Sequence, residues 1–205
     1  WRSEGSRMFI EAGDKVRIED LLMGLIVQSG NDAAVALAEH VAGSEEGFAD
    51  LMNQTAVELG MANSHFMNSA GMPHPDHYTT ARDVTSLTRA IIDSQPDHYQ
   101  RYAVREFTWN DITQKNRNPL LGRDSSIDGV KTGHTRSAGY CLVGSAERDG
   151  MRLIGTVIGT WVAATLAAVM VGELWGTGRW WLRRRTRREG WARREGRGKE
   201  AQGEW

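Results

Sequence analysis

The 205-residue sequence has little cysteine: Cys141 is the only one, so no disulfide can form within the chain. Cys141 lies in the apolar run 139–143, which favours a buried structural thiol over a reactive one, because a reactive thiol needs exposure and a lowered pKa. The histidines are scattered without the Cys/His spacing of a zinc site, although His74 and His77 flank Pro75-Asp76. We therefore expect neither a metal nor a cofactor.

The start of the sequence has no basic, apolar and small-residue stretch of the kind that forms a signal peptide. The chain opens at Trp1 in a polar segment, which indicates either a processed protein or a fragment. With 40% hydrophobic and 25% charged residues, the composition is that of a globular protein with a sizeable core rather than a disordered one.

The net charge of −1 conceals two regions of opposite charge. Residues 179–205 contain ten Lys/Arg and four Asp/Glu, a net +6, and the remainder contains 15 against 22, a net −7. An acidic body followed by a basic tail has to be interpreted as two separate segments.

Hydrophobic spacing and turn residues predict a helix-rich first half that leads into an antiparallel sheet, an α+β arrangement. The predicted helical half comprises a short hairpin over 8–18, helices over 19–28, 33–41, 44–60 and 80–95, and a loop over 60–79. Asn31 or Asp32 is the expected cap of the second helix, and Gly43 its end. The predicted strands are 106–109, 127–131, 139–146 and 152–158, the last two joined by Asp149-Gly150.

Two short motifs carry chemistry, Ser29-Gly30-Asn31 at a helix junction and Lys131-Thr132-Gly133 on a strand. In this order they resemble the second and third motifs of serine penicillin-binding proteins and β-lactamases. The likeness is to the D-alanyl-D-alanine carboxypeptidase branch and runs from about Met8 to Thr160. It includes the stretches 28–33, 59–61, 65–66, 80–83, 116–118, 128–135 and 138–140.

The resemblance implies a role for each site residue. Ser29 relays a proton to the leaving amine, and Asn31 holds the substrate's peptide groups. Lys131 favours proton loss from Ser29 and attracts the substrate's terminal carboxylate, to which Thr132 also donates. Gly133 leaves the sheet edge open to a substrate strand, and the backbone N–H of His134 is the second oxyanion donor.

Each motif also has a structural alternative. Ser29 and Asn31 alone are compatible with a helix stop and an N-cap, and Lys131 with a solvated lysine near a strand end. The length of the resemblance favours the functional interpretation.

The sequence lacks the family's first motif, S-x-x-K, which holds the acylated serine and its lysine base. No serine is followed by lysine three positions later, and only 28 residues precede Ser29. We therefore expect an incomplete penicillin-binding protein/β-lactamase-like transpeptidase domain, inactive as given, in residues 1–160. The arginine that the family carries after the strand resembling 151–160 is also missing.

Residues 161–205 form an atypical tail rich in Trp, Arg and Gly. The uncharged run 153–172 has the length of a membrane helix, and the Arg/Trp segment could bind RNA or anionic lipid. We interpret the tail as an out-of-frame translation without a stable fold, because Trp, Arg and Gly share G-rich codons.

The resemblance implies a carboxypeptidase that removes the terminal D-Ala of peptidoglycan pentapeptide and binds β-lactams, with no nucleic-acid partner. It also implies the outer face of the bacterial cytoplasmic membrane, with membrane association through the C-terminal region left open. The alternatives are a β-lactamase-related protein and a non-catalytic module that recognises peptidoglycan or penicillin.

Overall fold

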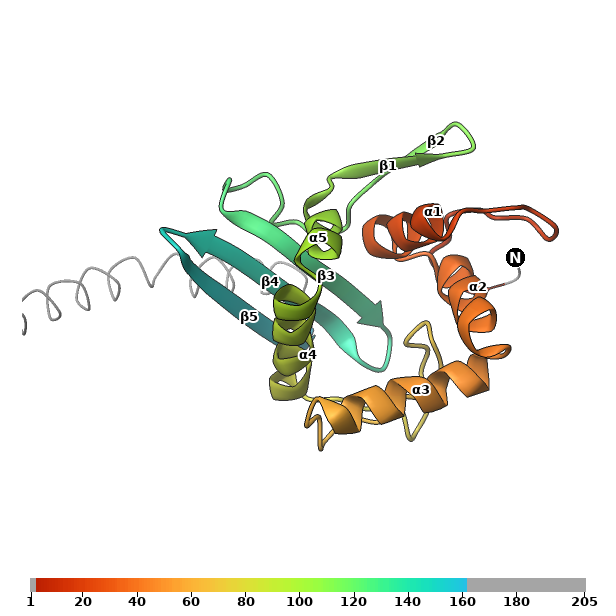
Figure 1. Cartoon of the computed structure of the whole chain (residues 1–205), viewed down its shortest axis with the longest axis horizontal. Helices are drawn as coiled ribbons and strands as arrows, with labels where there is room; N and C mark the ends of the chain where they lie inside the picture. The colour runs from red at the N-terminus through yellow and green to blue at the C-terminus, as the bar shows by residue number, and fades with distance from the viewer. Residues whose placement is uncertain (1–2, 162–205) are drawn as a thin grey trace, which may run out of the picture.

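Two groups of elements, one helical and one of β-strands, make up residues 3–161, the part of the chain that the computed structural model describes (Figure 1). The helical elements are α1 (Ile18–Met23), η1 (Gly24–Gln28), α2 (Asn31–Ala42), α3 (Glu45–Glu58), α4 (Ala81–Ser94), α5 (Pro96–Tyr99) and η2 (Gln100–Ala103). The strands are β1 (Glu106–Trp109), β2 (Ile112–Lys115), β3 (Ile127–Thr135), β4 (Gly139–Arg148) and β5 (Met151–Thr160). The predicted α+β fold is confirmed.

Side-chain caps fix the starts of α3 and α4 as the sequence predicts. Ser44 Oγ accepts a hydrogen bond from Gly47 N at 3.0 Å, and Thr80 Oγ1 accepts one from Asp83 N at 3.2 Å. Each cap satisfies one of the backbone N–H groups that a helix leaves without an intrahelical partner. The predicted end of α2 is also confirmed, since Gly43 follows it with φ 80°.

The start of α2 differs from the prediction. Gly30, rather than Asn31 or Asp32, is the N-cap, and no side chain caps the helix. The Asp32 carboxylate is instead occupied by the N-terminal segment, where it accepts hydrogen bonds from the backbone N–H groups of residues 8, 9 and 10. The predicted hairpin over 8–18 is wrong for the same reason, because these N–H groups bond a carboxylate and not a second strand.

The larger sheet is antiparallel, in the order β3-β4-β5, and its hairpin turn is the predicted Asp149-Gly150. Both turn residues have positive φ, 49° and 72°, as the tight turns that match strand twist require. The β1-β2 hairpin is only half predicted, since β2 was not expected. Its turn, Asn110-Asp111, also has positive φ at both residues and was an available signal.

Apolar side chains cover both faces of this sheet. On one face α4 and α5 bury Tyr99, Val130 and Val143 (Figure 1). A second cluster contains Leu120, Ile127, Leu142 and Ala146, and a third fills the space between α1, α2 and the N-terminal segment. The strand that carries the Lys131 motif is therefore held rigidly by the packing around it.

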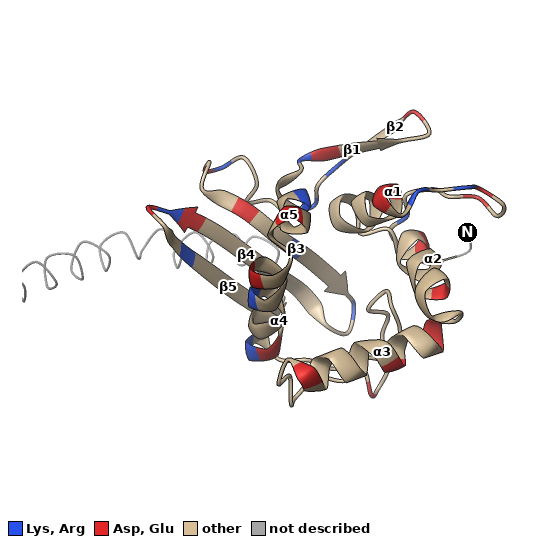
Figure 2. Cartoon of the chain, viewed as in Figure 1, with Lys and Arg blue, Asp and Glu red and all other residues tan. Residues whose placement is uncertain are grey.

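Acidic residues dominate the helical part: α2 and α3 contain Asp and Glu but no Lys or Arg (Figure 2). Within residues 3–161, no helix has the length and apolar character needed to cross a bilayer. The interpretations of the tail concern residues 161–205, of which only Trp161 is described. The alternative of a membrane helix over 153–172 is wrong for its first part, because residues 153–160 belong to strand β5.

Candidate active site

The junction between η1 and α2 places Ser29 at a sharp turn. Ser29 has φ 59° and ψ 42°, the left-handed conformation, and its N–H donates to Leu25 O at 3.1 Å. A non-glycine residue pays about 1–2 kcal/mol for this conformation, so the surrounding structure must hold it there. The turn ends the first helical segment and allows α2 to begin two residues later, at Asn31.

Lys131 reaches this turn from β3. Its Nζ donates to Ser29 Oγ and, at 2.9 Å, to the carbonyl oxygen of Thr132. The family resemblance implies that Lys131 acts on Ser29, and the contact between the two side chains that this requires is present. The two residues that the sequence separates by 102 positions form one hydrogen-bonded pair.

The electrostatic environment weakens the hold of Lys131 on its proton. Burial first, and the positive charge of Arg117 second, lower the pKa of Lys131 from its ordinary 10.5 to about 8. At pH 7 the ammonium form still exceeds the amine roughly tenfold. The site thus presents a cation that can donate to an oxyanion or carboxylate and that gives up its proton near pH 8.

Next to this pair lies a cavity of about 700 Å³. Its wall includes Lys131, Thr132 and Gly133 from β3 and residues 141–143 from β4. The wall also includes the loop segments 71–75 and 77–79. The third motif therefore faces a space large enough for a small peptide.

Asn31 is the first residue of α2, and its Nδ2 donates to Glu4 O and to Met72 Sδ, the latter at 3.7 Å. Met72 belongs to the cavity wall, so the Asn31 amide lies at the border of the cavity. His134 is different, since its ring packs on Tyr140 with centroids 4.1 Å apart and is not part of the wall. A role of His134 through its backbone, as predicted, is compatible with this placement.

Cys141 differs from the prediction of a buried thiol. It is only partly buried and belongs to the cavity wall beside Gly133, its partner in the β3-β4 register. The apolar run around it does continue into the core, because Leu142 is 1% exposed. Leu142 also belongs to the cavity wall, so membership of the apolar run does not by itself decide how far a side chain is buried.

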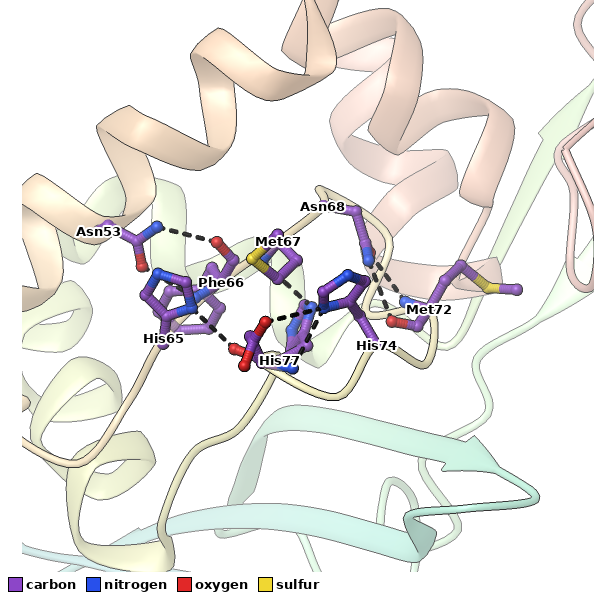
Figure 3. Close-up of polar contacts among 9 residues, drawn as sticks. Asn53, His65, Phe66, Met67, Asn68, Met72, His74 and His77 are labelled. Carbon is purple, nitrogen blue, oxygen red and sulfur yellow. Dashed lines mark hydrogen bonds and ion pairs between the residues drawn. The ribbon is translucent and has the colours of Figure 1, made fainter.

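Part of the loop over 60–79 lines the cavity, and hydrogen bonds to the loop backbone hold its conformation (Figure 3). Asn53 on α3 exchanges two hydrogen bonds with the backbone of Phe66, and Asn68 exchanges two with Met72. His77 Nδ1 accepts from Met67 N at 3.4 Å, and His74 Nδ1 accepts from Asp76 N at 3.1 Å. Residues 3–161 contain no group of three His, Cys, Asp or Glu arranged to hold a metal ion.

Two residues near the site had no predicted role. Arg117 belongs to the stretch 116–118, which carries part of the family resemblance but was given no role. Its positive charge lowers the pKa of Lys131. Asp32 immediately follows the Ser29-Gly30-Asn31 motif and is 2% exposed. Its signal was an acidic residue in the first turn of a helix, which the sequence analysis assigned to ordinary capping.

The sequence matches the family model of D-alanyl-D-alanine carboxypeptidase over residues 1–161. D-alanyl-D-alanine carboxypeptidase DacC of Escherichia coli is 48% identical over 155 residues, which cover 75% of this chain and 39% of that protein. The chain thus spans about 40% of the length of the curated relatives it matches.

Solved structures give the same result. The crystal structure of D-alanyl-D-alanine carboxypeptidase DacD from Francisella tularensis superposes with a TM-score of 0.78 at 36% identity, covering 80% of this chain and 52% of that one. Penicillin binding protein 6B from Escherichia coli gives 0.75 at 44% identity, covering 78% and 51%. At these identities the likeness extends beyond the fold.

Proposed function

Because the chain belongs to the D-alanyl-D-alanine carboxypeptidase family, we propose that it is the central part of a serine enzyme that removes the terminal D-alanine of peptidoglycan pentapeptide through an acyl-enzyme. The observation that carries the proposal is the Lys131–Ser29 hydrogen bond at the edge of the cavity. A hydroxyl paired with a lysine of lowered pKa is suited to proton transfer in acyl-group chemistry.

The proposed reaction needs a nucleophilic serine that the 205 residues do not supply as S-x-x-K. In the proposed mechanism Ser29 passes a proton to the leaving D-Ala amine, while the Lys131 cation stabilises the oxygen of Ser29 as the proton leaves. Lys131 and the Thr132 hydroxyl bind the substrate's terminal carboxylate through charge-assisted hydrogen bonds.

The remaining residues would hold the substrate strand. The Asn31 amide both donates and accepts, which suits a peptide group of the substrate. Gly133 is exposed on β3 and presents no side chain there, so an extended substrate can approach the strand closely. The N–H of His134 would donate to the oxyanion of the tetrahedral intermediate.

β-Lactams are proposed as ligands of the same site, since one of the similar structures is that of penicillin binding protein 6B from Escherichia coli. The proposed location is the extracytoplasmic face of the bacterial cytoplasmic membrane, where peptidoglycan lies. A non-catalytic module that binds peptidoglycan or penicillin with these motifs alone is the second candidate.

The test is to determine the in-frame coding sequence upstream of Trp1 and to express the extended protein. An S-x-x-K segment that forms a covalent adduct with labelled penicillin and releases D-Ala from a pentapeptide would support the enzyme. The 205 residues alone should do neither. Covalent labelling of the 205-residue chain would show that the nucleophile has been misplaced, and an extended protein without S-x-x-K would support the module.

A further inference from the structure

The Ser29 turn is surrounded by the N-terminal segment 4–10. Asn31 N donates to Ser6 O at 2.8 Å, and the Asn31 side chain donates to Glu4 O. Met8 is fully buried and packs against Gly24, at the start of η1, and against Gly30 of the turn. A Cβ on Gly24 would collide with the Met8 side chain, and one on Gly30 would lie 3.2 Å from Met8 N. Neither glycine could therefore be replaced without moving this segment.

One carboxylate holds that segment in place. Asp32 Oδ1 accepts from Met8 N and from its own neighbour Ala33 N, each at 3.0 Å. Asp32 Oδ2 accepts from Phe9 N at 2.9 Å and from Ile10 N at 3.3 Å. Three successive backbone N–H groups thus converge on a single anion, and the middle residue, Phe9, adopts φ 69° to allow it.

This arrangement has the geometry of an anion-binding nest that the protein fills with its own side chain. The carboxylate is 2% exposed, and its charge is compensated by four N–H donors and by the N-terminal end of α2, a 12-residue helix. Phe9 bears the cost of a left-handed backbone, which only a strong and specific interaction offsets.

We propose that Asp32 is the positioning residue of the Ser29-Gly30-Asn31 motif: by gathering the N–H groups of residues 8–10 it clamps segment 4–10 over the turn and holds Ser29 against Lys131. The inference rests on the proposed function for its catalytic meaning. The contact between Ser29 and Lys131 that it concerns can be followed through the titration of Lys131, which needs no enzymatic turnover.

Asp32→Asn is the informative change because it keeps the size of the side chain. Each oxygen of Asp32 accepts from two backbone N–H groups, so in either orientation the NH₂ of Asn would face two donors. The segment must then move away, the turn loosens, and water reaches Lys131. Loss of burial raises the pKa of a lysine, so the change has a defined direction.

Asp83 provides a matched control. It is 3% exposed, lies in the first turn of α4, and accepts from Asn63 N at 2.9 Å and Ser64 Oγ at 2.8 Å. Asp83→Asn removes a buried helix-start carboxylate of the same kind without touching segment 4–10. A purely structural role for Asp32 predicts that both variants behave alike.

The experiment follows the four lysines of the 205-residue chain by NMR of lysine labelled with ¹³C, as a function of pH. We expect Lys131 to titrate near 8 in the parent and in Asp32→Asn to shift upward by about 1 unit or more, with Asp83→Asn unchanged. An unchanged Lys131 titration in folded Asp32→Asn, or an equal shift in Asp83→Asn, would overturn the inference.

If Asp32→Asn lacks a cooperative unfolding transition, Asp32→Glu takes its place, because it keeps the charge but displaces the carboxylate by one methylene. The same upward shift is expected, and its absence overturns the inference. In the extended protein, Asp32→Asn should also slow acylation by labelled penicillin at least tenfold relative to Asp83→Asn. Failure of the extended protein without substitutions to acylate would reject the proposed function, while the Lys131 titration would still decide the positioning role.

Discussion

Lys131 Nζ on β3 donates a hydrogen bond to Ser29 Oγ at the turn before α2, which links the sheet to the helical part of the chain. The same Nζ also donates to Thr132 O. Because the pKa of Lys131 is lowered to about 8, this contact is sensitive to whatever changes the burial of the site.

In the extended protein, Lys131→Ala should slow acylation by labelled penicillin roughly 30- to 1000-fold. The change removes a cation that acts on Ser29 and on the substrate carboxylate, a loss of about 2–4 kcal/mol of transition-state stabilisation. Lys131→Arg keeps the charge with another shape and should recover the rate only in part. Lys15→Ala, in an exposed loop, is the control. If Lys131→Ala is acylated as fast as Lys15→Ala, the assignment of Lys131 to the site is wrong.

Gly133→Ala should separate substrate access from stability. A Cβ there would have Cys141 Cβ as its nearest neighbour, at 3.7 Å, so the methyl group fits the free protein and unfolding in urea should change by less than about 0.5 kcal/mol. The methyl would nevertheless occupy the exposed strand position that we assign to the substrate, and acylation should fall roughly tenfold, about 1.4 kcal/mol.

Gly129→Ala on the same strand should show the opposite pattern. Its Cβ would lie 2.6 Å from Tyr99 Oη, within the buried cluster under α5, and should cost about 1–3 kcal/mol of stability. Equal effects of the two substitutions on stability would contradict the distinction between Gly129, which is needed for packing, and Gly133, which leaves room for the substrate.

Arg152 on β5 anchors the far end of the sheet. Its guanidinium donates to Asp128 Oδ2 at 2.6 Å and to the buried Ser145 Oγ at 2.8 Å, and lies 5.4 Å from the centroid of the Tyr99 ring. Arg152→Ala should lower the free energy of unfolding in urea by about 1–3 kcal/mol, because these groups lose their partner.

Arg148 is the matched control for Arg152. It pairs with Asp124 at the same end of the sheet, but its side chain is 45% exposed, so Arg148→Ala should cost no more than about 1 kcal/mol. A larger loss of unfolding free energy at Arg148 than at Arg152 would contradict the view that the burial of the guanidinium determines its contribution.

We expect the free energy of unfolding to depend on pH through His77, which lies in the loop that lines the cavity. Burial first, and the charges of His65 and His74 after it, lower the pKa of His77 below its ordinary 6.5. Its Nδ1 also accepts from Met67 N, which requires the neutral ring (Figure 3). Below pH 6.5 the unfolded state therefore takes up the proton first, and stability falls until the folded pKa is reached.

His77→Asn keeps an acceptor near Nδ1 and does not titrate. We expect it to reduce the loss of unfolding free energy between pH 7 and 5, measured in urea. The exposed His40→Asn, at the end of α2 and outside this loop, should retain the parental profile. A His77→Asn profile identical to that of the parent would contradict the assignment.

The sequence alone predicted the elements with strong local signals. Ser44 and Thr80 mark helix starts because a hydroxyl at the N-cap satisfies a backbone N–H within three residues. Asp149-Gly150 marks a hairpin because its residues accept positive φ. The family resemblance likewise follows from ordered motifs, and the family model confirms it.

The sequence could not predict what long-range contacts decide. The loose alternation over 8–18 indicates a hairpin, but the N–H groups of residues 8–10 bond Asp32, more than 20 residues away, and the hairpin does not form. Cys141 and Leu142 share one apolar run and both belong to the cavity wall, and only the packing of β4 makes Leu142 fully buried and leaves Cys141 partly exposed.

The site shows the same division between local and tertiary information. The residue types of Ser29 and Lys131 are fixed by sequence, and the resemblance of their two motifs to a known family implied that they meet. The strength of their contact, the lowered pKa of Lys131 and the clamp of Asp32 are set by burial and by which distant groups surround them. Local pattern encodes backbone conformation, whereas the dielectric and the partners of a charged group exist only once the chain has folded.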